Sequence, residues 1–135
     1  MRVDDLLRRA ASAHRIAMER ALASLEITPA QFAVLQIVAD APGVSSAEAA
    51  RLERLTPPTM SVIVGNLERK GAVVRRPHPK NARIQCLQLT GFGLDLSQKA
   101  LASVQGLQMR VAAALPSDAA TDIRVWLSRV AEIEV

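Results

Sequence analysis

Residues 56–90, TPPTMSVIVGNLERKGAVVRRPHPKNARIQCLQLT, decide the fold of this 135-residue chain. Thr56 is a helix-capping residue type, and Pro57 suits a first helical position because the N–H it lacks would have no partner there. Gly71, after a basic pair, is typical of a left-handed stop at the end of a helix. Between these limits the apolar residues recur at i, i+3, i+4 and i+7, which predicts a helix with one buried stripe. The stripe consists of Met60, Ile63, Val64 and Leu67.

A basic hairpin is predicted directly after this helix. Residues 73–74 and 84–89 are typical of two short strands, and the connection RRPHPKNAR (75–83) is too basic and too proline-rich to lie in a core. A helix with one free face beside such a hairpin suits double-stranded DNA. The helix fits the major groove and the hairpin tip can reach the minor groove.

The placement of charge favours the same partner. Residues 45–90 hold eight basic and three acidic residues, a net charge of +5, whereas the remainder holds nine basic and ten acidic residues, a net charge of −1. The excess positive charge therefore lies in the segment that is expected to meet a polyanion. A solvated helical surface is the alternative interpretation of this charge.

Other classes of function find no support in the sequence. The single cysteine excludes a disulfide framework and a cysteine-based zinc cluster, and there is no glycine-rich phosphate loop. The two histidines, His14 and His78, lie in dissimilar segments, so we expect no metal, no cofactor and no enzymatic activity. No apolar run has the length of a membrane span, and the N-terminus carries acids unlike a signal peptide. We expect a cytoplasmic protein with no membrane partner.

The chain before residue 56 is predicted to be helical. Apolar spacing indicates a helix over residues 3–24, and Thr28 caps a second helix in a capping box with Gln31. Ser45 or Ser46 caps a short third helix over 47–55. The third helix and the helix from Pro57 form a helix-turn-helix arrangement. The buried stripe of the second helix is expected to contain Phe32, Leu35, Val38 and either Gln36 or Ile37.

Two further helices are predicted after the hairpin. Thr90 caps a long helix to about Leu115, and Ser117 with Asp118 starts a last helix that contains Trp126. These helices and the first one are richer in alanine and leucine than a single DNA-binding module needs. We therefore expect the first and last helices to pack against a second copy of the chain, with Trp126 in the core of the homodimer.

These motifs, in this order, resemble the MarR family of winged-helix regulators. Residues 28–55 look like the second and third helices of that family, and residues 56–76 like its recognition helix and the entry to its wing. The stretch RPHPKNARIQCLQLTGFG (76–93) is similar to the family's wing signature. The resemblance implies a mostly α-helical fold with a small wing, and a homodimer that binds a near-palindromic operator. It also implies transcriptional repression and release of DNA by a small aromatic or anionic effector.

The resemblance divides the chain into regions and assigns roles to its residues. Segments 1–27 and 91–135 would form the dimer, and 28–90 would be the DNA-binding region of a single domain. Arg83 matches the wing-tip arginine that enters a narrow minor groove. Arg75, Arg76 and Lys80 are expected to contact phosphates. The base-reading candidates are Thr59, Ser61, Val62 and Asn66, and Thr56 is either a DNA contact or only a helix cap.

Three positions depart from the family pattern. An arginine is common where this chain has Val62, a polar residue where it has Gly65, and an aspartate where it has Asn81. Gly65 costs a helix about 1 kcal/mol relative to alanine, so close approach to DNA or to a neighbouring helix is expected there. These departures keep open an alternative, a winged helix that has lost DNA binding and docks on a protein. The basic tip argues against that alternative.

Two single residues have competing interpretations. His14 lies on the first helix, where this family lines its ligand cleft, and it is either an effector contact or an ordinary interface residue. Cys86 is either an oxidant sensor or a small strand residue. Since sensing cysteines are typically accessible and near an interface helix, we expect the strand role.

Overall fold

The computed structural model describes residues 1–133 and shows a mostly helical chain with one antiparallel hairpin, as expected. Residues 134–135, the end of the predicted dimerisation segment 91–135, lie outside the described residues. No single helix within residues 1–133 is long and apolar enough to cross a membrane. The elements are α1 (Val3–Leu22), the 3₁₀ turn η1 (Ala23–Leu25), α2 (Pro29–Asp40), α3 (Ser46–Leu52), α4 (Pro57–Arg69), β1 (Val73–His78), β2 (Asn81–Leu89), α5 (Gly91–Ala113) and α6 (Ala120–Ala131).

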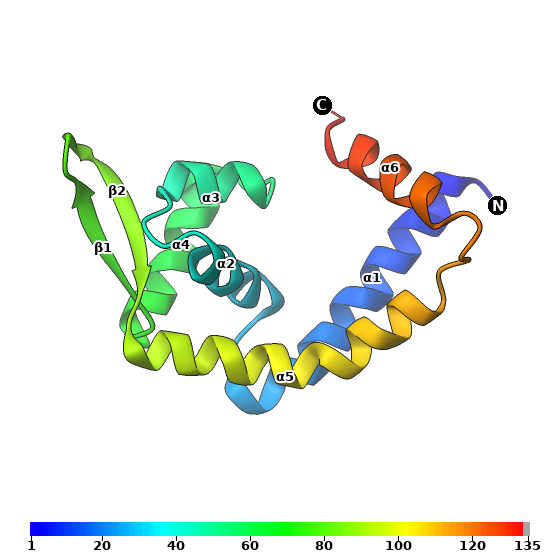
Figure 1. The fold of residues 1–135 in the computed structure, drawn as a ribbon, viewed down its shortest axis with the longest axis horizontal. Helices are drawn as coiled ribbons and strands as arrows, with labels where there is room; N and C mark the ends of the chain where they lie inside the picture. The colour runs from blue at the N-terminus through cyan, green and yellow to red at the C-terminus, as the bar shows by residue number, and fades with distance from the viewer. Residues whose placement is uncertain (134–135) are drawn as a thin grey trace.

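Helix α5 connects two lobes of the molecule (Figure 1). At its N-terminal end, α2, α3, α4 and the hairpin cluster together, with the hairpin projecting away from the helices. At its C-terminal end, α5 runs beside α1 and leads into α6, so both chain termini lie far from the hairpin. The arrangement separates a winged helix-turn-helix from a helical region made of the two ends of the chain.

The core lies mainly inside the helix-turn-helix lobe. All four residues of the predicted α4 stripe are buried, and Val34 of α2 is fully buried although the sequence did not indicate it. Gln36 and Ile37, the two alternatives for the α2 stripe, are both half-buried. The largest fully buried side chains are Leu22, Leu35, Met60, Leu67, Leu87, Val34, Val38, Val64, Val73 and Val104.

Side-chain caps start the central helices where the sequence predicts them. The Thr28 hydroxyl accepts from the Gln31 amide at 3.1 Å, and the Gln31 side chain accepts from the Thr28 amide at 3.0 Å, which completes the capping box. Ser45, rather than Ser46, caps α3 by accepting from the Glu48 amide at 3.0 Å. Gly71 has φ +76°, so the predicted left-handed stop after α4 is confirmed.

The hairpin is longer than predicted. Its strands cover Val73–His78 and Asn81–Leu89, so most of the expected connection 75–83 is β-structure. Pro77 is tolerated because β1 is an edge strand of a two-stranded sheet, where the missing N–H interrupts no further ladder. The cations within the strands remain compatible with pairing because most of this hairpin is open to solvent.

Two other predicted boundaries were wrong. Helix α3 ends at Leu52 rather than continuing to Leu55, since Arg54 adopts the left-handed region with φ +55°. The last helix begins at Ala120, and Ser117 and Asp118 lie in a preceding turn instead of capping it. In that turn the Ala119 amide donates to the Pro116 carbonyl at 3.2 Å.

Candidate nucleic-acid interface

Helix α4 presents one buried face and one open face. Val62 is 62% exposed and Ser61 is also exposed, on the side of the helix away from the core stripe. At the N-terminus the Thr56 hydroxyl accepts from the Thr59 amide at 3.3 Å and donates to the Thr59 hydroxyl at 3.0 Å. Thr56 therefore acts as a cap, which leaves Thr59, Ser61 and Val62 as the polar and apolar groups of the open face.

In the C-terminal half of α4, Asn66 and Arg69 are hydrogen-bonded to each other. The Arg69 guanidinium donates to Oδ1 of Asn66, one turn earlier on α4. Asn66 is half-buried, and because its Oδ1 accepts from Arg69, its amide nitrogen is the part of the side chain that keeps its donors available. The guanidinium of Arg69 also carries positive charge to the same end of the helix.

Gly65 has no packing partner in the described chain. A Cβ at this position would meet nothing nearer than a guanidinium nitrogen of Arg69, at 3.5 Å. The alternative in which a neighbouring helix of the same chain approaches Gly65 is therefore wrong. Of the two explanations for glycine, only close approach of DNA is left.

The wing carries cations that form no ion pair within residues 1–133. Arg76, Lys80 and Arg83 are exposed, and none of them belongs to a described ion pair. Side chains shape the turn that displays them. Nδ1 of His78 accepts from the Lys80 amide at 3.0 Å, and Oδ1 of Asn81 accepts from the Arg83 amide at 3.1 Å. The wing tip is thus an ordered loop with free positive charge.

Arg75 differs from the other wing cations. Its Nε donates to Oε1 of Glu68 at 2.8 Å, and a second guanidinium nitrogen donates to the Ser61 carbonyl at 3.4 Å. Its side chain is 27% exposed. The structure thus joins Arg75 to α4, and Glu68 is a residue of this surface that the sequence analysis did not single out.

His14 lines a cavity of about 500 Å³ between α1, α2 and α5. Met18 and Phe32 contribute apolar surface to the cavity. Arg15, beside His14, is paired with Glu19 at 2.7 Å. The family resemblance singles out His14 on α1, whereas the rest of the cavity depends on how three helices pack. The polar lining residues are His14, Arg15, Gln36, Asp40, Glu53 and Gln108.

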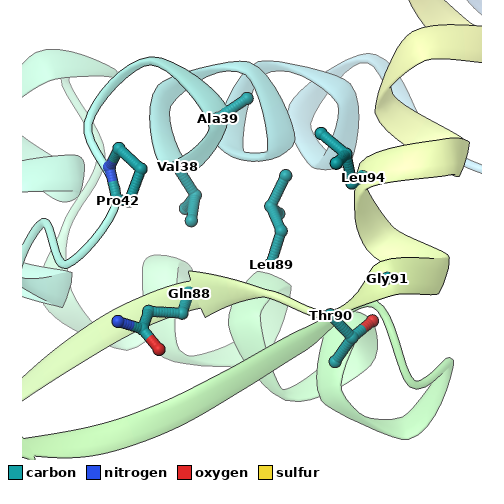
Figure 2. Close-up of a pocket in the computed structure, with 8 residues that line it drawn as sticks. All are labelled: Val38, Ala39, Pro42, Gln88, Leu89, Thr90, Gly91 and Leu94. Carbon is teal, nitrogen blue, oxygen red and sulfur yellow. The ribbon is translucent and has the colours of Figure 1, made fainter.

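A smaller cavity of about 310 Å³ lies where α2, β2 and α5 meet (Figure 2). Val38, Leu89 and Leu94 line it and give it a largely apolar surface. The hydroxyl of Thr90 accepts from the Gly93 amide at 3.0 Å and donates to the Gly71 carbonyl at 2.5 Å. Because that hydroxyl is already satisfied, the amide of Gln88 is the polar side chain of the lining that a ligand would meet.

Within residues 1–133 there is no group of three or more His, Cys, Asp or Glu residues that would hold a metal ion. Cys86 is half-buried in β2, where its backbone pairs with Ser45.

The terminal helices leave a large apolar surface uncovered. Helix α6 has no buried residue, and Trp126 is 38% exposed. Such a surface on an amphipathic helix is unusual in a monomer and is typical of an interface. The exposed large hydrophobic side chains on α1, α5 and α6 include Val3, Leu6, Ile16, Leu101, Met109, Val111, Val125, Trp126 and Leu127.

Comparison with known sequences identifies relatives over almost the whole chain. A family model described as MarR family matches residues 25–84. The HTH-type transcriptional repressor Rv2887 of Mycobacterium tuberculosis is 32% identical over 125 residues, which cover 93% of this chain and 90% of that protein.

Comparison with solved structures gives the same result. The repressor CouR bound to a 23-mer DNA duplex superposes with a TM-score of 0.86 at 26% identity, covering 97% of this chain and 93% of CouR. The regulator PcaV from Streptomyces coelicolor, in complex with its natural ligand, has a TM-score of 0.86 at 25% identity, covering 98% of this chain and 93% of PcaV. CouR from Rhodococcus jostii has also been solved with p-coumaroyl-CoA.

Proposed function

This chain belongs to the MarR family of winged-helix transcription regulators, and we propose that it represses transcription as a homodimer on a near-palindromic operator. In this proposal segments 1–27 and 91–135 form the dimer, and segment 28–90 binds DNA. The uncovered apolar surface of α1, α5 and α6 supports the first part, because those side chains would be removed from water in a dimer.

One observation carries the DNA-binding proposal. The open face of α4 lies beside a hairpin whose Arg76, Lys80 and Arg83 have no ion-pair partner within residues 1–133. An α-helix fits the major groove, and an arginine on an adjacent wing can enter a narrow minor groove. Thr59, Ser61, Val62 and Asn66 would meet base edges, while Arg76 and Lys80 would contact phosphates.

The cavity beside His14 is the proposed effector site. The ligand complexes of PcaV and CouR support this part of the proposal, since both relatives share the fold and bind small molecules. Phe32 and Met18 suit an aromatic ring, and His14 and Arg15 suit an acidic group. A ligand that binds one arrangement of the helices better than the other shifts the protein away from its DNA-binding form.

We further propose that the protein works by binding alone, in the cytoplasm, without a catalytic step, a cofactor or a metal. The relatives are named as transcriptional repressors and regulators, which act on DNA and not on a covalent bond. A winged helix that docks on a protein is the second candidate. The exposed Val62 and the uncharged Gly65 favour it, since neither supplies a charge that would attract DNA.

Salt dependence separates the two candidates. Fluorescence anisotropy should measure the affinity of the protein for duplex DNA between about 50 and 200 mM salt, where each phosphate contact adds about 0.9 to the slope of log affinity against log salt. Arg83→Ala should weaken binding most on sites with A·T-rich flanks. Lys99→Ala is a matched control, because this exposed cation pairs locally with Asp95 on α5. A flat salt dependence would favour protein docking.

The effector proposal has its own measurement. Benzoates and hydroxycinnamates, with their neutral amides as controls, are added to the protein–DNA complex and to free protein in a thermal shift experiment. The carboxylates should release DNA and raise the unfolding midpoint, and His14→Ala should reduce both effects. Equal responses to acids and amides would show that the cavity selects the ring and not the charge. No response to any compound would contradict the assignment of this cavity.

A further inference from the structure

The direction of Arg75 follows from the register of the hairpin. Val73 pairs with Leu89, Arg75 with Leu87, and Arg76 with Cys86. Side chains of directly paired residues lie on the same face of a sheet, and successive residues alternate between faces. Leu87 is fully buried, so Arg75 lies on the core side of the wing, and Arg76 lies on the opposite side.

On the core side of the wing, the Arg75 side chain contacts helix α4. Its contacts with Glu68 and with the Ser61 carbonyl are seven residues apart on α4, a span of about two helical turns. The guanidinium therefore binds α4 at two points, the carboxylate of Glu68 and the backbone carbonyl of Ser61, which is one of the base-reading candidates.

The pair with Glu68 is of a different kind from the other ion pairs of the described chain. Within residues 1–133 the remaining pairs join residues only three or four positions apart in the chain. Arg75 and Glu68 instead join β1 to α4 at 2.8 Å, with both side chains more than half covered. Local pairs stiffen a helix, whereas this pair fixes one element against another.

We propose that Arg75 is a positioning residue that holds the wing against α4 through Glu68, and that it is not a phosphate contact. The inference rests on the proposed function of DNA binding. A dimer that inserts α4 into the major groove and the wing into the minor groove needs both at a fixed angle. Without this pair the hairpin would be held at its base alone, by apolar packing and by the backbone pairing of β2 with residues 43–45. The angle of its outer part would then be less fixed, and ordering that part on DNA would cost binding free energy.

The sign of one substitution distinguishes positioning from charge. Glu68→Gln removes a negative charge beside the DNA-binding surface, so electrostatics alone predicts equal or tighter binding to a polyanion. Positioning predicts weaker binding instead, by about threefold to tenfold, in line with the loss of a partly covered ion pair. Glu48→Gln is the matched control, since Glu48 pairs only locally with Arg51 on α3. The control should bind DNA at least as tightly as the parent.

Arg75→Ala completes the test. It should weaken binding about as much as Glu68→Gln, the double variant should be no weaker than either single variant, and the salt slope should stay that of the parent. The charge swap Glu68→Arg with Arg75→Glu should bind more tightly than either reversal alone. A slope reduced by about 0.9 for each protomer of the dimer in Arg75→Ala, or tighter binding by Glu68→Gln, would overturn the proposal.

A measurement without DNA separates this proposal from the proposed function. Amide hydrogen exchange of free protein should become faster in the hairpin of Glu68→Gln and stay unchanged in α5. Unchanged exchange in the hairpin overturns the positioning role even if the protein binds DNA. Faster exchange in Glu68→Gln, in a protein that binds no duplex DNA, would support the positioning role of the Arg75–Glu68 pair and contradict the proposed DNA binding.

Discussion

Gly65 places opposite demands on stability and on DNA binding. The helix interior favours alanine over glycine by about 1 kcal/mol, and no neighbouring atom of the described chain opposes a methyl group there. Gly65→Ala should therefore raise the free energy of unfolding by about 0.5–1 kcal/mol in a urea titration. It should also weaken binding to the operator, because the added methyl would stand between the helix and the base edges. Unchanged affinity would show that DNA does not approach Gly65.

At the residue scale, the arginines show what sequence can and cannot predict. Arg75 and Arg83 both belong to one basic stretch, and nothing in their types separates a free cation from a paired one. The difference depends on strand alternation, which becomes visible only when the first strand is extended from Val74 to His78. Because residues 75–83 were predicted to be a connection and not strands, the sequence did not indicate that Arg75 lies on the core side of the wing. The α4 stripe, by contrast, was predictable because helical spacing alone defines it.

Thr90 joins three elements at the base of the wing. Its hydroxyl caps α5 by accepting from the Gly93 amide, and it donates to the Gly71 carbonyl in the turn after α4. Thr90→Val keeps the shape and removes both bonds, so the free energy of unfolding should fall by about 1–3 kcal/mol. Thr90→Ser keeps the hydroxyl and should cost less. A larger loss for Thr90→Ser than for Thr90→Val in thermal denaturation would mean that the methyl, and not the hydroxyl, contributes the stability.

At the element scale, capping residues in the sequence predicted where most helices begin. They could not predict features that depend on strand pairing or on turns. Thr28 and Thr56 cap their helices through bonds three residues away, so sequence is sufficient to place them. The length of the hairpin depends on a partner strand, and an edge strand tolerates Pro77. Ser117 and Asp118 have capping side chains, but the turn from Pro116 to Ala119 delays the last helix.

The whole molecule should be stable only as a dimer. Trp126 and its apolar neighbours on α6 are exposed in the single chain, and a second copy would cover them. Trp126→Ala should weaken association by about 3–5 kcal/mol if the ring is fully buried in the dimer. Trp126→Phe should lose less. Analytical ultracentrifugation of the parent and both variants measures this, and a parent that stays monomeric at micromolar concentration would contradict the dimer.

The cavity beside His14, the proposed effector site, belongs to this scale as well, which explains why the sequence identified only part of it. His14 could be named from its place on the first helix and a family resemblance. Gln36 and Gln108 line the same space from α2 and α5, and no spacing rule connects residues so far apart in the chain. Their proximity results from the packing of α1, α2 and α5, and only the folded structure shows it.

Selection of binding sites from random duplex DNA by the purified protein tests the central claim most directly. Two copies related by a two-fold axis must reach the same side of the duplex, so the enriched sites should contain two inverted half-sites. Their centres should be about one helical turn apart, roughly 10–10.5 base pairs. Enrichment of such pseudo-palindromes is the predicted result. Recovery of no sequence above background, or of single half-sites without a fixed spacing, would contradict a dimeric operator-binding regulator.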